Sequence, residues 1–489
     1  MNKKPIIAII AIIIICAGAF LLINTNSSDF NSANLDVNAL EDKGNIIVDS
    51  ESLDETNGFY HTASSDVNTV LVKNGGILKL ANSLINKTGD TASSGDDADF
   101  YGINAAVLVN TNGTLEISNV EINTNSKGSN GIFVTNSDSS SSSSGSAGQN
   151  SGEGSQPPEV QGSSQPGQTP DGNVGGEQSG QSTVEGNTQA NIKNVKITTH
   201  SDKSRGLDAT YNGIINAENV IINTNGQSCA ALATDRGEGQ VHVKNSQINT
   251  GVSKDSGRGS PLIYSTGNIT VENTKGTAYV SQIACIEGKN SIQVTNSELT
   301  GYGEGNRQDG NEYVDLGGIF IYQSMSGDSD IGTSLFTAKD SKLSIAEDSS
   351  VYRDAPMFHI TNTACVVDLE NTELSFGSGV FLEASCQNQW GSEGSNGGDC
   401  ELNTNNEKIE GDVIVDSISS LIWNLENTKF SGAINSTGNT TVNVGSGSTW
   451  TLTGDSSVSS LTVEGNIEYG EYSLTVNGQT YNSSNPFKA

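Results

Sequence analysis

The stretch GTLEISNVEI at residues 113–122 is one copy of a ten-residue phrase that decides the fold of this chain. The third and fifth positions of the phrase are apolar and the positions between them are mostly polar, which is the period of a strand with one buried face. Clear copies are GILKLANSLI at 76–85, GIINAENVII at 213–222, GQVHVKNSQI at 239–248, GNITVENTKG at 267–276, NSIQVTNSEL at 290–299, CVVDLENTEL at 365–374 and LIWNLENTKF at 421–430. Weaker copies are IKNVKI at 192–197 and LFTAKDSKL at 335–343.

The seventh position of the phrase is nearly always asparagine. Asparagine tolerates the left-handed backbone of a corner and can hydrogen-bond its own turn. Asparagines stacked in successive coils can also hydrogen-bond to one another as a ladder. The predicted ladder consists of Asn82, Asn119, Asn194, Asn219, Asn245, Asn273, Asn296, Asn371 and Asn427, with Asp340 replacing asparagine once.

Closely spaced copies recur every 23 to 28 residues, as the steps from Asn219 to Asn245, Asn273 and Asn296 show. Short strands separated by corners at this period indicate a solenoid in which each coil contacts only its neighbours. We therefore predict an all-β fold, a single-stranded right-handed parallel β-helix, preceded by a transmembrane helix. About twelve coils at roughly 4.8 Å per coil would make a rod on the order of 60 Å long.

Composition and charge limit the classes of partner that this chain can bind. The chain has 24 basic and 56 acidic residues, a net charge of −32, which repels nucleic acid and anionic lipid head groups. The charge suits a solvated extracellular surface or divalent-cation binding, and solubility alone is the alternative interpretation. We see no Cys/His metal cluster, phosphate-binding glycine loop or Ser/His/Asp constellation. We therefore expect no cofactor and no dedicated metal site, although Ca²⁺ is possible.

The N-terminus indicates export. Lys3 and Lys4 precede an apolar run from Pro5 to Ile23, which is long enough to cross a bilayer as a helix with its start in the cytoplasm. A cleaved signal peptide is the alternative. In both cases we expect the body of the protein outside the cell, and in the first case at the cell membrane.

The predicted organisation follows from these patterns. Residues 1–24 form the anchor, 25–64 an exposed linker and N-terminal cap, 65–481 the β-helix and 482–489 a tail. Residues 136–190 are rich in Ser, Gly, Gln and Pro and cannot bury enough apolar area to order themselves, so we expect a disordered insertion. A domain linker is the alternative there. Residues 403–481 form the C-terminal coils and cap.

The sequence predicts two different environments for its cysteines. Cys229, Cys285 and Cys365 lie in apolar, strand-like contexts, which favours buried and inert thiols. Cys386 and Cys400 flank a glycine-rich loop, and a disulfide between them is plausible in an oxidising exterior.

Charged and polar residues recur at the strand ends of consecutive coils. If these strand ends stack, carboxylates, an arginine and a lysine share one stripe of the rod, with His359 one coil further on. Trp390, in the glycine-rich loop, could stack on a sugar or cover the loop's own apolar surface. The candidate ligand-binding residues are Asp208, Asp235, Arg236, Glu238, Glu287, Lys289, Tyr322, Gln323 and Trp390. The alternative is that they are ordinary turn and surface residues of an acidic protein. We assign no catalytic residue, because no lyase or hydrolase signature surrounds them.

Several phrases carry a resemblance to a known group: SRGLDATYNG at 204–213, AALATDRGEG at 230–239, CIEGKN at 285–290, IFIYQSMSGD at 319–328 and PMFHITNTA at 356–364. With the repeats, residues from about 65 to 481 resemble prokaryotic adhesin-like surface proteins, which share the pectin-lyase-like right-handed β-helix. Near the C-terminus the chain resembles the cap of autotransporter passengers, through Trp450, Thr453, Gly454, Asp455 and Ser456. The resemblance implies the fold but does not choose among lyases, hydrolases and adhesins.

We therefore predict a membrane-tethered, adhesin-like cell-surface protein that binds a polysaccharide or a surface glycan and does not bind nucleic acid. A long, regular polar face can meet an extended polymer at many weak points and gain avidity. A Ca²⁺-dependent polysaccharide lyase or a glycoside hydrolase of the same fold is the first alternative. A purely structural surface spacer is the second.

Overall fold

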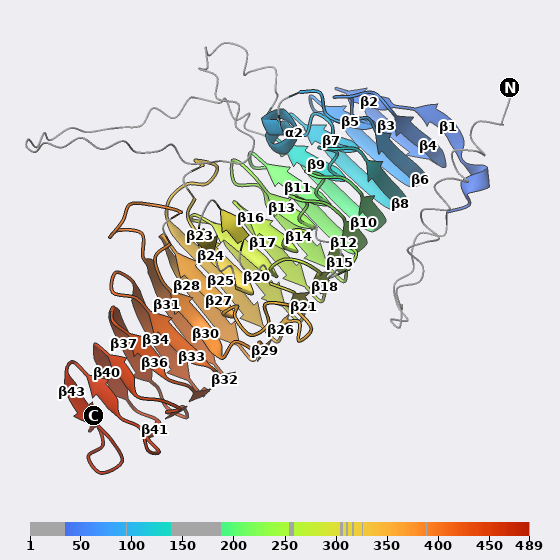
Figure 1. Ribbon diagram of the computed structural model, residues 1–489. Helices are drawn as coiled ribbons and strands as arrows, with labels where there is room; N and C mark the ends of the chain where they lie inside the picture. The colour runs from blue at the N-terminus through green and yellow to red at the C-terminus, as the bar shows by residue number, and fades with distance from the viewer. Residues whose placement is uncertain are drawn as a thin grey trace, which may run out of the picture.

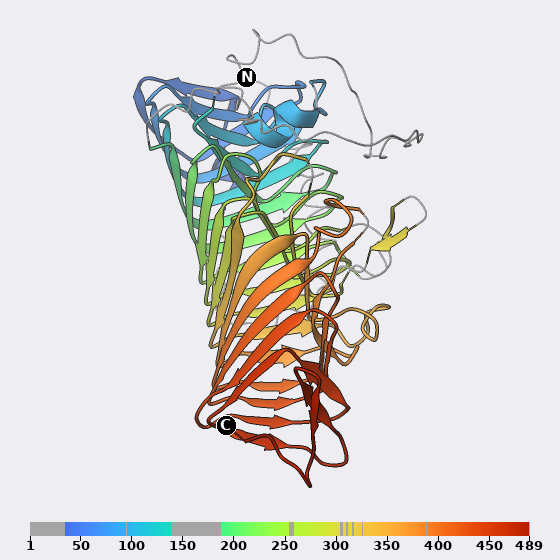
Figure 2. The ribbon, with the colours of Figure 1, turned by 90° about the vertical axis from the view of Figure 1, so that its left-hand side faces the viewer.

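The computed structural model describes residues 35–93, 95–137, 187–253, 259–303, 307–309, 312–314, 317–324, 326–387 and 389–488. Strands dominate this part of the chain, and they stack in parallel along an elongated rod that runs from β1 to the C-terminus (Figure 1). Viewed after a quarter turn, the successive coils lie as layers one below another (Figure 2). The prediction of an all-β parallel solenoid is confirmed, and its handedness stays a prediction.

A large bent sheet, here called the corner sheet, follows the asparagine corners along the rod. In the described part of the chain it contains 21 strands. They are β1 (Glu41–Gly44), β3 (Ser52–Thr56), β4 (Gly58–Thr62), β6 (Ile77–Thr88), β8 (Thr114–Asn125), β10 (Gln189–Thr199), β12 (Ile214–Thr224), β14 (Gln240–Lys244), β15 (Gln247–Thr250), β17 (Asn268–Glu272), β18 (Lys275–Ala278), β20 (Ser291–Thr295), β21 (Glu298–Gly301), β25 (Thr333–Lys339), β26 (Lys342–Ile345), β28 (Thr363–Glu370), β29 (Glu373–Ser375), β31 (Gly398–Asn405), β34 (Ser420–Glu426), β37 (Asn439–Val444) and β40 (Ser460–Val463).

A second parallel sheet, here called the short-strand sheet, closes each coil. Within the described ranges it contains 13 strands. They are β2 (Ile46–Asp49), β5 (Val70–Lys73), β7 (Val107–Asn110), β9 (Ile132–Thr135), β11 (Leu207–Thr210), β13 (Leu232–Thr234), β16 (Ile263–Ser265), β19 (Ala284–Glu287), β24 (Ile319–Tyr322), β27 (Phe358–Thr361), β30 (Val380–Ala384), β33 (Asp412–Val415) and β36 (Ile434–Ser436).

The remaining described elements are short. A parallel sheet near the C-terminus holds β32 (Lys408–Glu410), β35 (Lys429–Ser431), β38 (Thr449–Thr451) and β41 (Asn466–Glu468). The end of the rod holds β39 (Ser456–Val458), β42 (Leu474–Val476) and β43 (Gln479–Tyr481). An antiparallel pair, β22 (Arg307–Asp309) with β23 (Glu312–Val314), lies on a loop, and the helical turns are η1 (Val37–Ala39) and α2 (Gly95–Tyr101).

The alternation of the phrase explains the core. On β8, Leu115 and Ile117 are buried and Glu116 between them is exposed. The same columns in other coils join one continuous apolar core along the rod. Glycine opens the phrase at Gly113 because a Cβ atom there would lie 2.8 Å from the carbonyl oxygen of Val72 on a neighbouring coil.

The structure places the predicted asparagines at the corners with left-handed backbone. All nine have φ between 47° and 55°. Their side chains bond from coil to coil: the Nδ2 group of Asn119 donates to Asn82 Oδ1 (3.3 Å), and that of Asn194 donates to Asn119 Oδ1 (3.1 Å). Further rungs join Asn219 to Asn194, Asn273 to Asn245 and Asn371 to Asp340. The ladder also includes Asn406, which donates to Asn371 and which the sequence analysis did not assign.

A second ladder of hydroxyl groups lies one residue after the corner. The backbone N–H of Ser246 donates to Thr274 Oγ1 (3.3 Å), and that of Thr274 donates to Ser297 Oγ (3.0 Å). Each hydroxyl in turn donates to the carbonyl oxygen two residues earlier in its own strand, as Thr274 does to Glu272. The corner therefore satisfies its buried backbone groups with side chains of the next coil.

The boundaries of the rod differ in detail from the predicted ones. Strands begin at Glu41, and β3 pairs with β6, so residues 41–62 contribute strands to the first coils. Most of the predicted insertion, residues 138–186, lies outside the described residues. Its ends meet, because the Thr188 hydroxyl donates to the Asn136 side chain, and Gln189 already belongs to β10. β10 pairs in register with β8, so the coil resumes where it was interrupted.

The end of the rod contains the phrase that resembles a passenger cap. Trp450 on β38 is fully buried, and its indole N–H donates to the carbonyl oxygen of Gly432 (3.0 Å). Asp455 accepts from the backbone N–H of Ser473 (2.8 Å) and from its hydroxyl. β42 stacks parallel on β39 but pairs antiparallel with β43, so the strand direction reverses there.

The predicted anchor, residues 1–24, lies outside the described residues. Across the described ranges, which start at Leu35, no helix combines the length and the apolar character needed to cross a membrane.

Candidate functional site

One register column crosses the outer face of the short-strand sheet. Its members are Cα partners in successive coils, and their neighbours Leu207 and Ala209 belong to the core, so strand alternation turns the column outward. The column runs through Phe133, Asp208, Ala233, Tyr264, Cys285, Phe320, His359 and Glu383. Most of these outward residues are nevertheless buried, which means that loops cover this face.

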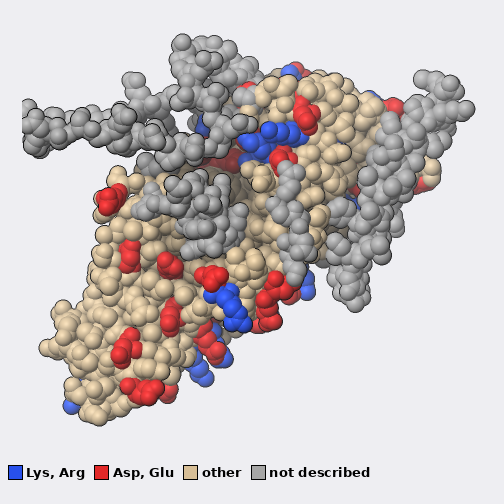
Figure 3. Space-filling view, in the orientation of Figure 1, with Lys and Arg blue, Asp and Glu red and all other residues tan. Residues whose placement is uncertain are grey.

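A cavity of about 670 Å³ lies under those loops. Asp99 and Phe100 of α2 line one side, and Trp390 lines the other. Tyr264 and Phe320 from the register column form part of its wall. Figure 3 shows acidic and basic side chains gathered beside α2 on this face of the molecule.

A buried arginine organises the charged side of the cavity. Arg205 is only 8% exposed, and its Nη1 donates to Asp99 Oδ1 (2.9 Å). Its Nε lies 2.8 Å from Asp235 Oδ2 and 3.5 Å from Asp208 Oδ2. Lys203 bonds the second oxygen of Asp99 (2.9 Å). A buried cation thus holds three carboxyl groups that come from α2 and from two successive coils.

The three carboxyl groups do not carry equal charge. Burial raises the pKa of Asp208 well above its ordinary value, and the negative charge of Asp235 raises it further. Burial also raises the pKa of Asp235, to about 6, while Arg205 opposes that rise. Burial thus favours the neutral form of both Asp208 and Asp235, whereas Arg205 favours their charged forms.

Glu287 is held by hydroxyl groups beneath the cavity wall. It is 2% exposed, and it accepts from the Tyr264 hydroxyl (2.8 Å) and from the hydroxyls of Ser324 and Ser326. Because hydroxyl donors surround the carboxylate, its buried charge is solvated by the protein.

Aromatic rings form the other side of the cavity. The Trp390 ring lies 4.9 Å from Tyr322 and 5.6 Å from Phe320, measured between centroids. The Asn396 side chain fixes the loop by donating to the carbonyl oxygens of Trp390 (2.9 Å) and Gln387 (2.6 Å). Trp390 therefore packs on its neighbours and also lines the cavity, and its stacking on a sugar stays a prediction.

The predicted stripe divides into two groups. Asp208, Asp235, Glu287, Tyr322 and Trp390 converge on the cavity or its supports. Arg236 stands beside it, paired with Asp328 and 3.9 Å above the centre of the Phe100 ring.

The other candidates lie elsewhere. Lys289 bonds Glu238 (2.5 Å) and Asp330 (3.0 Å) at the surface, and Gln323 donates to the backbone of Ser324. Lys289 and Gln323 line a separate hollow on the same side of the rod.

The predicted disulfide between Cys386 and Cys400 is wrong. Both thiols are free, Cys386 is exposed, and Cys400 is buried in the core. Strand alternation on β31 turns Cys400 inward, where it is the register partner of Cys365 on β28. The prediction that Cys229, Cys285 and Cys365 are buried is confirmed.

Sequence reasoning missed the centre of the charged network. Arg205 lies in the phrase SRGLDATYNG, which indicates no separate role for it, and Asp99 lies on α2, far away in the sequence. The contact between them depends on how a loop folds over the rod, which the repeat does not specify. Among the described residues, no group of three or more His, Cys, Asp or Glu side chains is arranged to hold a metal ion.

Comparisons with known proteins add little to this description. No protein-family model matches the chain, and no curated protein matches it. Among solved structures, the chain is similar to the Streptococcus pneumoniae surface protein and adhesin PfbA, with 10% sequence identity over 87% of this chain and 90% of that chain. The TM-score of that match is 0.28, which is too low to support a shared function.

Proposed function

We propose that this chain is a cell-surface, adhesin-like protein that binds a saccharide in the cavity on the short-strand sheet. The observation that carries the proposal is the composition of the cavity wall, where the rings of Trp390, Tyr322 and Phe320 line the same cavity as Asp235. An aromatic ring offers an apolar face to the C–H side of a sugar, and a carboxylate accepts hydrogen bonds from its hydroxyls. A concave site with few polar groups among aromatic ones is typical of small-ligand recognition.

The arrangement of the acids favours binding over hydrolysis. Glycosidases place two carboxyl groups at least about 5 Å apart, on either side of the scissile bond. Here Asp208 and Asp235 both contact Arg205, and Asp208 is fully buried beneath it. Glu287 is occupied by three hydroxyl donors. These contacts hold the acids in a structural network rather than poising them around a substrate bond.

Surface display is the second part of the proposal. The two lysines and the apolar run from Pro5 to Ile23 would tether the chain, with the rod outside the membrane. The net charge of −32 keeps such a rod solvated and away from nucleic acid. A tethered rod suits attachment of the cell to a glycan surface, because many weak contacts made by immobilised molecules together give a high avidity.

A glycan array probed with the purified full chain tests the binding function. We expect a restricted set of glycans to bind, and Trp390→Ala to weaken binding at least tenfold because the cavity loses its largest ring. Tyr481→Ala is the matched control, since Tyr481 belongs to an aromatic pair with Phe487 at the far end of the chain. An array without binding, or binding unaffected by Trp390→Ala, would contradict the proposal.

The same preparations test the enzymatic alternative. Bound glycans incubated with the protein should be recovered intact, both with and without Ca²⁺. Release of shortened or unsaturated products that requires Asp235 would show a hydrolase or lyase instead.

A further inference from the structure

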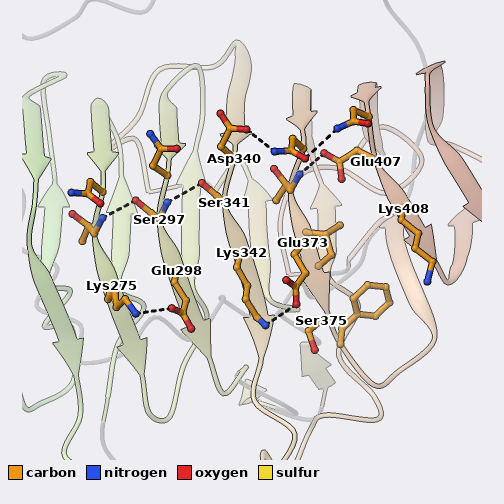
Figure 4. A pocket seen from close by; sticks show the side chains of 18 of the residues that line it. Lys275, Ser297, Glu298, Asp340, Ser341, Lys342, Glu373, Ser375, Glu407 and Lys408 are labelled. Carbon is orange, nitrogen blue, oxygen red and sulfur yellow. Dashed lines mark hydrogen bonds and ion pairs between the residues drawn. The ribbon is translucent and has the colours of Figure 1, made fainter. Parts of the chain in front are cut away.

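A second concave surface lies outside the asparagine corner, on a different face from the cavity. It is a groove of about 1260 Å³, and Figure 4 shows its lining from close by. Most coils contribute a corner amide and the hydroxyl that follows it, and several also contribute a charged side chain. The corner residues along the groove are Asn219, Asn245, Asn273, Asn296, Asp340, Asn371 and Asn406.

The groove has the length and period of a polymer site. Its corner residues belong to seven successive coils, and six steps at roughly 4.8 Å give a length of about 29 Å. Similar donors and acceptors recur at most steps, with a spacing close to the length of one sugar residue. An extended chain of similar units could therefore make the same contact many times.

The charges of the groove disfavour an anionic polymer. Lys275 bonds Glu298 (3.0 Å), and Lys342 bonds Glu373 (2.7 Å), so these lysines are neutralised within the groove (Figure 4). Lys408 likewise bonds Glu410. The lining holds three lysines against four glutamates and one aspartate, a net charge of −2. Figure 3 shows this mixture of signs along the edge that carries β21, β26, β29 and β32.

One residue breaks the regular lining. In the five coils before it the hydroxyl ladder has Ser or Thr, at Ser246, Thr274, Ser297, Ser341 and Thr372, but Glu407 occupies this position on the coil of β31. Within the described strands, no pairing joins β29 to β32, so the sheet is interrupted between these two strands. The glutamate side chain is longer than that of serine or threonine, and it spans this interruption. Its Oε1 accepts from the backbone N–H of Thr372 (2.7 Å), as Figure 4 shows. The hydroxyl ladder resumes at Thr428, which accepts from the N–H of Glu407.

The other carboxyl oxygen of Glu407 is left without a partner. The residue is 4% exposed and lines the groove, and its Oε2 has no hydrogen bond. Burial raises the pKa of this carboxyl to about 7. A buried polar atom without a partner costs free energy, and because this oxygen has almost no accessible surface, a ligand hydroxyl in the groove would recover that cost by drawing the side chain outward.

We propose that this groove binds an extended, uncharged polysaccharide, and that Glu407 is a specificity-determining residue that hydrogen-bonds a ligand hydroxyl. The ladder amides would bond the sugars along the rest of the groove. A peptide strand fits less well, because the strands beneath are already paired and offer no free edge to extend. The groove is separate from the cavity, and each site can bind without the other.

Calorimetric titration of uncharged linear oligosaccharides into the full chain tests the proposal. Three β-1,4-linked series are used, of glucose, N-acetylglucosamine and mannose, each with two to eight sugars. We expect at least one series to bind, with affinity that rises with length and levels off near six sugars. Glu407→Thr restores the residue type of Thr372 and Thr428 while removing the carboxyl group. This variant should weaken binding at least fivefold, and Glu407→Gln shows how much of that loss is due to charge.

Two controls separate this site from others. Glu401→Gln changes an exposed glutamate of the same coil outside the groove and should leave the affinity unchanged. Trp390→Ala should also leave it unchanged, whereas we expect the same variant to weaken binding in the cavity at least tenfold. The proposal is overturned if none of the three series binds, if Glu407→Thr binds as well as the native chain, or if polygalacturonate binds more tightly than the uncharged series.

Discussion

Arg205 Nε and Asp235 Oδ2 lie 2.8 Å apart, although the two residues belong to different coils and meet only because the coils stack in register. The guanidinium also approaches Asp208 and donates to Asp99 on α2. One buried cation therefore links two coils of the rod to the loop that covers them. Substitutions of the arginine and of its acidic partners can test this network separately.

Removing the guanidinium group of Arg205 should lower the free energy of unfolding far more than replacing the carboxyl group of Asp208. Arg205→Met leaves buried carboxylates without compensation, which typically costs about 3–5 kcal/mol of unfolding free energy. Asp208→Asn should cost less than about 1 kcal/mol, because burial favours the neutral form of this carboxyl group and an amide is a neutral group of the same shape that keeps a donor toward Asp235. Urea unfolding of the two variants measures both values. A large loss in Asp208→Asn would show that this carboxyl is ionised.

Each asparagine corner stabilises the fold in two ways, through its left-handed backbone and through its side-chain hydrogen bonds, and substitutions can separate the two. Asn119 has a φ of 54°, donates to Asn82 and accepts from Asn194. Asn119→Gly keeps the left-handed backbone and loses the two side-chain bonds, so we expect a loss of about 1 kcal/mol. Asn119→Ala also forces a Cβ into that conformation, which adds about 1–2 kcal/mol. Chemical unfolding should rank native above Gly above Ala, and equal losses would contradict the role of the backbone.

Glu407 predicts a pH-dependent stability. Its pKa is about 7 in the folded chain, because of burial, against an ordinary value of 4.5. A raised carboxyl pKa favours the protonated folded state, so this stabilisation is complete below pH 4.5 and is lost as the pH rises through 7. At pH 8 Glu407→Gln should be more stable than the native chain by roughly 1–3 kcal/mol, a range reduced for solvent in the groove.

The check is a comparison of thermal unfolding at pH 5 and pH 8. The advantage of Glu407→Gln should be larger at pH 8 than at pH 5. Glu401→Gln, on the same coil but exposed, should show no such difference. An advantage that is the same at both values would mean that Glu407 titrates normally.

The cysteines should differ sharply in reactivity. Cys386 is exposed, whereas Cys365 and Cys400 face each other in the core. A hydrogen bond to Asp416 raises the pKa of the Cys386 thiol, so labelling is best done near pH 8.5. Maleimide labelling of the folded chain, followed by peptide mapping, should modify Cys386 first among the described cysteines. Labelling of Cys400 at a similar rate would show that its strand is displaced.

The repeat made the interior of the rod predictable. Apolar columns such as Leu115 and Ile117, and corners such as Asn119, follow from local rules: strand alternation and the backbone preference of asparagine. The hydroxyl ladder was missed because Ser, Thr and Val all occur in that column, so no single residue type marks it. Glu407 could be recognised as an exception only once the hydroxyl column around it was known.

The covering loops were not predictable in the same way. Asp208 and Asp235 were assigned from the repeat, but their common partner Arg205 and its second acid Asp99 depend on where α2 lies. The repeat also carries no information on register within a loop, which is why Cys400 was paired with Cys386 and not placed opposite Cys365. Local periodicity fixes the stacked strands, whereas the loops need tertiary contacts.

The reversal of strand direction at β43 has a consequence for how many copies can share a surface. A stack of parallel coils is in principle open-ended, since its last strand offers the same free edge as every strand before it. At this end β43 pairs antiparallel with β42 and turns the chain back on itself. On this face of the rod, the first coil of a neighbouring copy would meet a hairpin of the opposite polarity, which blocks continuation of the stack of β39 and β42. Densely crowded molecules should therefore not fuse into fibrils through this face.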